Sequence, residues 1–233
     1  MGALSFAMRP LLDIASPPSQ TKQISVRGAI GEGVLWAVLG GYRSIVADFT
    51  WLKSYIAWER RDIPATMANI SLATKLDPHN TLFWHMGGGM IAYDMPHWII
   101  NERPHTPLQQ RHVRELQGRQ ALEFLEEGLT FIPDSRRLQL NKALIYEKVF
   151  NDIDKELEAY SLAAKGDAPL FILRDYAKKL EKAGRLDDAL RELKRAEASA
   201  DKTHLSYKFL QEHIQEVENK LESQKNMLDL IKK

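Results

Sequence analysis

Apolar residues recur along most of this chain at the three-to-four-residue spacing of amphipathic helices. The clearest example is residues 169–196, where two facing stripes of apolar or small residues consist of Phe171, Leu173, Ala177 and Leu180, then Ala189, Leu193 and Ala196. Gly184 lies between the stripes, where a helix C-terminus needs a left-handed residue that glycine adopts at little cost. The pattern predicts two short antiparallel helices joined by a tight turn.

The same spacing predicts helices toward the N-terminus. Residues 1 to about 27 lack it and contain Ser16-Pro17-Pro18-Ser19, which favours an extended arm. An apolar helix follows from Gly31, and Gly40-Gly41 predicts a break before a second helix from about Arg43 to Arg60. The next helix carries Pro64 in its first turn and ends before Asp77-Pro78.

Two further hairpins are expected between residues 82 and 164. Trp84, Gly87 and Gly88 mark the opening of one, whose partner helix ends near Pro133. Pro133 lies 133 − 78 = 55 residues after Pro78. The spacing resembles that of tetratricopeptide repeats, whose period of ~34 residues implies an insertion of about 21, which we place at 94–115. The third hairpin spans 136–164. Ala121 and Ala189 are 189 − 121 = 68 residues apart, about twice that period.

These features resemble the tetratricopeptide repeat (TPR) family over roughly residues 44–198. The stretch 169–196 has the family's small residue, Gly, Ala and Ala in order. The resemblance implies an all-α solenoid of helical hairpins, with an arm and apolar helix at 1–42, the array at 43–200 and a capping or coiled-coil helix at 201–233. The segment Gly40–Tyr55 is also similar to the lead-in of bacterial TPR proteins that carry an N-terminal membrane anchor.

In TPR proteins the first helices of successive repeats line a groove that holds an extended partner segment. Carried over by position, the resemblance implies that the groove includes Trp51, Tyr55, Trp58, His85, Leu140, Leu144, Phe171, Arg174 and Lys178. The aromatic residues among them have two interpretations, as core packing or as anchors for a peptide.

The last segment carries a heptad pattern over about 25 residues. Its apolar positions step alternately by three and four, and we expect a C-terminal interface at Leu210, Ile214, Val217, Leu221 and Leu228. One interpretation is a helix that caps the open edge of the last repeat; the other is a coiled coil or a docking helix for another subunit.

Composition limits the chemistry of the chain. The 233 residues carry a net charge of +1, which gives no general attraction to nucleic acid or to an anionic membrane. With no cysteine, the chain has no disulfide, Cys-based zinc site or thiol nucleophile. Gly33–Tyr42 is uncharged but only about half as long as the ~20 residues of a membrane span.

The histidines and glycines offer weaker candidates. Five of the seven histidines fall between Pro78 and Val113, without the spacing of a helical metal site. We expect the segment around residues 95–107 to be a loop, in which Asp94, His97 and Glu102 are the candidate metal ligands. Gly87-Gly88-Gly89 lacks the preceding strand of a phosphate loop and favours close helix packing instead.

The sequence therefore predicts a non-enzymatic scaffold, without cofactor or metal, that binds protein partners and assembles with other subunits. Two alternatives stay open: a metal-dependent enzyme built on the histidine-rich segment, and a membrane-peripheral subunit held by Trp36 and its helix. Homo-oligomerisation is left open, and the expected location is the cytoplasm or the bacterial cell envelope.

Overall fold

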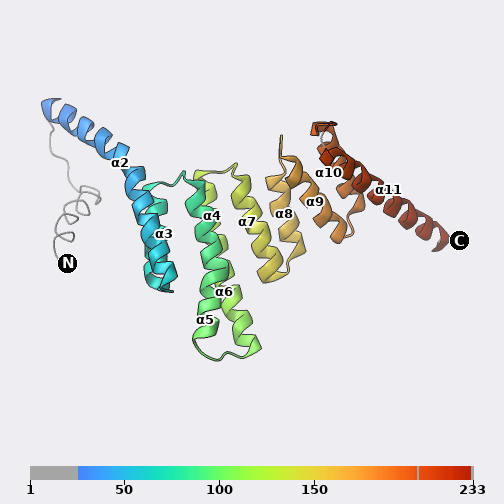
Figure 1. Cartoon of the computed structure of the whole chain (residues 1–233), viewed down its shortest axis with the longest axis horizontal. Helices are drawn as coiled ribbons and strands as arrows, with labels where there is room; N and C mark the ends of the chain where they lie inside the picture. The colour runs from blue at the N-terminus through green and yellow to red at the C-terminus, as the bar shows by residue number, and fades with distance from the viewer. Residues whose placement is uncertain (1–25, 204, 232–233) are drawn as a thin grey trace. The chain divides into compact units, whose positions relative to one another are not determined.

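A computed structural model of the protein describes residues 26–203 and 205–231, which contain helices and turns (Figure 1). The chain divides into two units, Met1–Arg43 and Ser44–Lys233. The described part of the first unit is the start of helix α2 (Val26–Glu59); the arm predicted for residues 1 to about 27 lies almost wholly outside the described residues, as does the side chain of Trp36. Within the described ranges, no helix is both long enough and apolar enough to span a bilayer.

Helix α2 runs through Gly40-Gly41 without interruption, so the predicted break there is wrong. A glycine inside a helix costs only about 1 kcal/mol relative to alanine. Two glycines therefore lower helix stability but do not by themselves end a helix of 34 residues.

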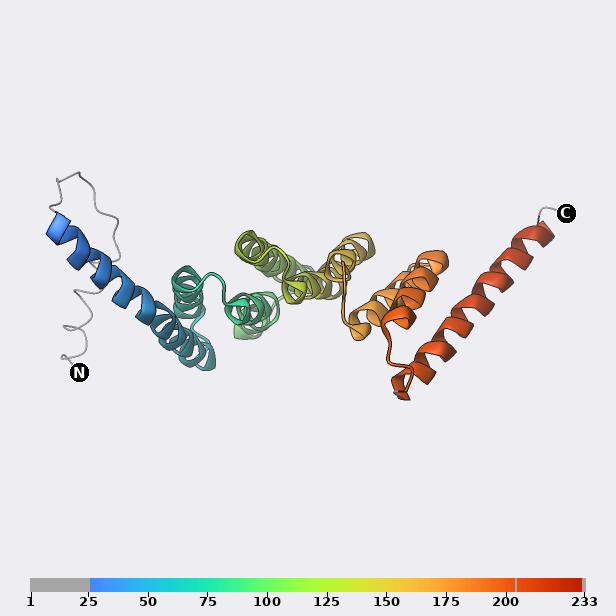
Figure 2. The same cartoon turned by 90° about the horizontal axis from the view of Figure 1, so that it is seen from above.

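The second unit is an array of antiparallel helical hairpins, and the predicted all-α, TPR-like fold with a long C-terminal helix is confirmed (Figures 1 and 2). After α2 the helices are α3 (Ile63–Leu76), α4 (Thr81–Gly89), α5 (Met95–Glu102), α6 (Pro107–Phe131), α7 (Arg136–Ile145), α8 (Ile153–Ala163), α9 (Leu170–Lys182), α10 (Leu186–Ser199) and α11 (Leu205–Ile231). Each hairpin packs on the next, with contacts of α3 with α4, α4 with α7, and α8 with α9.

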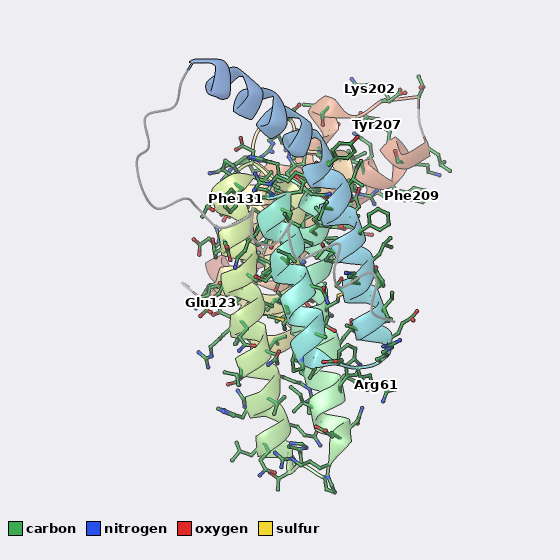
Figure 3. The ribbon with its side chains drawn as sticks, turned by 90° about the vertical axis from the view of Figure 1, so that its left-hand side faces the viewer. Arg61, Glu123, Phe131, Lys202, Tyr207 and Phe209 are labelled. Atoms are coloured by element: carbon green, nitrogen blue, oxygen red, sulfur yellow. The ribbon has the colours of Figure 1, made fainter. Side chains whose placement is uncertain are left out.

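Local sequence explains the turns between these helices. Arg61 adopts a left-handed conformation, with φ of 56°, at the turn after α2 (Figure 3). The Asp62 side chain then accepts a hydrogen bond from the Ala65 backbone N–H at 3.0 Å, which caps α3. Gly184 has φ of 75° after α9, as its position predicted.

The segment predicted as an insertion is helical rather than a loop. A π-helical segment, η1 (Met90–Asp94), joins α4 directly to α5, and α6 begins at Pro107. Thr106 caps α6 in a reciprocal pair with Gln109. The extra residues therefore lengthen both helices of the second hairpin, and only a short turn at 103–106 separates them.

Two apolar cores hold the second unit together. One lies under the first two hairpins and the other under the last ones. In the first core α4 and α6 approach closely through glycine: a Cβ added at Gly128 would lie 2.7 Å from Cδ2 of the buried Trp84. The indole of Trp84 donates to the Pro78 carbonyl at 2.8 Å. Of the three glycines predicted to serve helix packing, Gly87 and Gly88 lie against Phe124 and Leu125 of α6, whereas Gly89 has no atom within 4 Å of an added Cβ.

A partly buried cluster of one lysine and two carboxylates joins the third and fourth hairpins. The Lys179 ammonium lies 2.7 Å from a carboxylate oxygen of Glu147 and 2.8 Å from one of Glu156, whose side chain is buried. Burial alone would lower the pKa of Lys179, but the two carboxylates outweigh burial and raise it. The lysine therefore keeps its charge and fixes α9 against η2 (Tyr146–Phe150) and α8.

Helix α11 packs along α10 and closes the second core. Four of its heptad positions, Leu210, Ile214, Val217 and Leu221, are only 0–8% exposed. The side chain of Leu228 lies outside those that the structure describes. Glu181 of α9 pairs with Lys220 at 2.9 Å and with His213. The four apolar residues therefore belong to the core of the chain itself, and a partner could reach them only by displacing α11.

Candidate binding groove

A pocket of about 470 Å³ opens where α4, α7 and α9 meet, on the first helices of three successive hairpins. It contains four of the residues predicted for the groove: His85, Leu140, Leu144 and Phe171. Leu144 is 42% exposed and Phe171 is 59% exposed. The pocket therefore offers apolar side chains to solvent on the face where the TPR resemblance implies a ligand.

Hydrogen bonds between the helices fix the walls of this pocket. The buried Asn141 side chain donates to the His85 carbonyl at 2.8 Å, which joins α7 to α4. Arg136 donates to the Asp167 carboxylate at 2.9 Å and to the Lys165 carbonyl at 3.2 Å, which joins the start of α7 to the turn before α9. The walls therefore come from helices held in place before any ligand arrives.

One cation at the pocket remains available for a ligand. Arg137 is exposed, and no ion pair links it to another residue of the described chain. Burial, with a further contribution from the Arg137 charge, lowers the pKa of His85 from its ordinary value, which disfavours its charged form. The arrangement suits an apolar side chain with a carboxylate near it.

The structure does not bring the remaining predicted groove residues to this pocket. Trp51 is 6% exposed and stacks on Phe83 at 5.0 Å between ring centroids, so it is a core residue and not a groove anchor. Tyr55 and Trp58 are half-buried, and their rings pack edge to face with 6.1 Å between the centroids. The Trp58 indole donates to the Asp94 carboxylate at 2.8 Å.

Two predicted residues of α9 also lie outside the pocket lining. Lys178 is exposed. Arg174 is half-buried, and its Nε is fully buried without a hydrogen-bond partner among the described residues. Their assignment to a partner site stays a prediction.

Five residues of the pocket lining were not predicted from the sequence: Arg136, Arg137, Asn141, Pro169 and Ile172. A signal for one of them existed. Arg137 precedes Leu140 by three residues and Leu144 by seven, which places all three on one helical face. The others depend on how α9 approaches α7, which helical periodicity does not specify.

A second pocket, of about 430 Å³, lies beside the π-helical segments. Its lining includes Tyr93 of η1, Lys148 of η2, and Arg114 and His97. The Tyr93 hydroxyl is buried without a partner in the described chain, and burial, together with the Glu147 charge, raises its pKa to about 12. Both π-helical segments thus line one cavity. Segments of this kind are frequent at functional sites.

The grouping considered for the metal alternative does not form. Asp94 binds the Trp58 indole, while His97 contacts Asn101 on the next turn of α5. His105 contacts the carbonyl oxygens of Ile100 and Arg103. Among the residues described, no three histidine, aspartate or glutamate side chains are grouped as ligands of a metal ion.

Trp98 of α5 packs back on the array through its contact with Trp58 of α2. Its ring centroid lies 6.1 Å from that of Trp58.

Comparison with known proteins gives distant structural matches. No family model matches the chain, and no curated protein matches it. A thermophilic TPR protein of Thermus thermophilus, TTC0263, is 18% identical with a TM-score of 0.37, over 73% of this chain and 98% of that one. The MamA protein is 14% identical with a TM-score of 0.30, over 67% and 91%. At these values the likeness says nothing about the partners of the present chain.

Proposed function

We propose that this protein is a non-catalytic scaffold that binds an extended segment of a partner protein in the groove formed by α4, α7 and α9. The observation that carries the proposal is the pocket lined by the exposed apolar residues Leu144 and Phe171 beside the exposed Arg137. Exposed aromatic and apolar side chains in a preformed concave site are effective peptide anchors.

The chemistry of the groove defines the expected ligand. Phe171 and Leu144 offer an apolar wall for one large apolar side chain of the partner. Arg137 can form a charge-assisted hydrogen bond with an acidic side chain or with a terminal carboxylate. We therefore expect a segment in which an apolar residue lies next to a carboxylate.

The test is selection of a displayed peptide library on the full-length protein. We expect enrichment of peptides that pair an apolar anchor with Asp, Glu or a C-terminal carboxylate. Phe171→Ala should abolish their binding. Arg137→Glu should shift the selection toward Lys and Arg, since the charge at the site is reversed.

Phe209→Ala is the matched control, because Phe209 is 51% exposed but lies on α11 (Figure 3). This variant should bind the selected peptides like the wild type. Selection that yields no enriched peptide, or peptides that bind Phe171→Ala normally, would contradict the groove assignment. Helical content measured by circular dichroism checks that each variant is folded.

A further inference from the structure

A row of large apolar side chains on α2 is open to solvent. Within the second unit these are Ile45, Phe49, Leu52 and Ile56, which are 47%, 63%, 56% and 50% exposed. Val46 beside them is 41% exposed. Large contiguous exposed apolar surfaces are uncommon on monomers and mark interaction sites.

These residues occupy the side of α2 that faces away from its own core. Ala47, Trp51 and Ser54 are buried on the opposite side, where Ala47 and Trp51 join the core with Phe83 and Ile70. At about 100° per residue, Phe49 and Ile56 lie roughly opposite Ala47 and Ser54. A partner could therefore cover this row without disturbing the hairpins.

The spacing of the row fits a helical partner. Ile45, Phe49, Leu52 and Ile56 step by four, three and four, which are the d, a, d and a positions of a heptad seam. In the sequence, the same steps lead back to Tyr42 and Val38. A bilayer surface requires an apolar face but no such register.

The charges beside the row indicate a second copy in parallel orientation. With Phe49 at position a, Asp48 is at g and Lys53 is at e, five residues apart. In a parallel two-helix coiled coil, g of one helix meets e of the following heptad on the other. Asp48 of each copy would then face Lys53 of the other copy, twice by symmetry.

An antiparallel pair would lose this match, because it places the two g flanks together and the two e flanks together. Asp48 and Lys53 are both exposed, and neither forms an ion pair with another residue of the described chain. Both charges are thus free for the intermolecular contacts of the parallel pair.

We propose that the protein forms a parallel homodimer in which Ile45, Phe49, Leu52 and Ile56 of α2 pack against the same residues of a second copy. Short isolated helices rarely pair, since each must first be ordered. Here the helix is already fixed to the hairpin array by Trp51, so association costs no helix formation.

The first experiment is sedimentation equilibrium of the full-length protein at about 100 µM, because small interfaces are weak. We expect twice the monomer mass of 26.7 kDa. Phe49→Asp should give the monomer, whereas Phe209→Asp, at a similarly exposed phenylalanine of α11, should leave the dimer intact. Asp48→Lys should weaken the dimer, and Asp48→Lys with Lys53→Asp should restore it.

The lack of cysteine in the chain allows a direct test of orientation. In a parallel pair, Ile45→Cys faces its own copy and should form a disulfide-linked dimer on oxidation. In an antiparallel pair, residue 45 lies near residue 56 instead, and no such link forms. A monomeric wild-type protein, a dimeric Phe49→Asp variant, or a dimer without the Ile45→Cys link would overturn the proposal, as would a monomer that binds lipid vesicles through this row.

Discussion

The two ends of the second unit carry the same sequence pattern with opposite outcomes. On α11 the heptad positions from Leu210 to Leu221 are 0–8% exposed, because α10 covers them. On α2 the heptad positions from Ile45 to Ile56 are 47–63% exposed. The difference shows that a heptad pattern gives the apolar face of a helix but does not say whether the rest of the chain covers that face.

The reason lies in what each helix follows. Helix α11 begins at Leu205, soon after α10 ends at Ser199, so it can fold back on α10 and cover the open edge that every solenoid leaves. Helix α2 instead contributes its other side to the first core, through Ala47 and Trp51. Its seam is therefore left exposed by the described part of the chain.

The largest expected effect comes from placing the same charged residue in the heptad pattern of α11 and in that of α2. Leu210→Asp would place a charge in a fully buried position, and we expect it to destabilise the protein by at least about 4 kcal/mol. Leu52→Asp at the exposed seam should cost less than about 1 kcal/mol. Urea unfolding of both variants, followed by far-ultraviolet circular dichroism, measures the difference.

Because Leu52 lies in the proposed dimer contact, this comparison is made at a protein concentration low enough to keep the chain monomeric. Similar losses for the two variants would mean that α2 is covered by another part of the chain. The seams would then be equivalent, and the contrast between the two ends would be wrong.

The predictability of each region follows from how local its determinants are. The sequence predicted both helices of the last hairpin and the left-handed residue Gly184 between them, because the turn and both apolar stripes lie within one short stretch. The break at Gly40-Gly41 was wrong, because glycine only weakens a helix. The segment 94–115 was misread as a loop, although most of it belongs to helices α5 and α6.

One pocket groups part of the residues predicted for the groove, for a related reason. His85, Leu140, Leu144 and Phe171 come together because the repeat places equivalent helices side by side. Trp51 was assigned to the groove, although it lies in the core, because the spacing of an aromatic stripe gives its face but not what covers that face. Exposure is a tertiary property, and it decides both the groove and the α2 seam.

A smaller effect is expected within the first core, at the close approach of α4 and α6. Gly128→Ala would bring a Cβ within 2.7 Å of the rigid Trp84 ring, so overpacking should cost about 1–3 kcal/mol despite the better helix propensity of alanine. Gly89→Ala is the control, because no atom lies within 4 Å of its added Cβ, and it should stabilise α4 slightly. Equal changes in the thermal midpoint of both variants would show that this packing is not tight.

The smallest effect concerns the ionic contact that holds α11 at the other end. Burial alone would raise the pKa of Glu181, but the hydrogen bonds from Lys220 and His213 outweigh burial and hold it below 4.5. A carboxylate whose pKa is lower in the folded state stabilises the fold above the unfolded pKa, and this contribution is lost as the pH falls through the folded value. The stability difference between the wild type and Glu181→Gln should therefore be largest near neutral pH and vanish in acid, as urea unfolding between about pH 7 and pH 3 would show. A difference that does not change with pH would mean that Glu181 acts by packing rather than by charge, and α11 would then be held by its apolar seam alone.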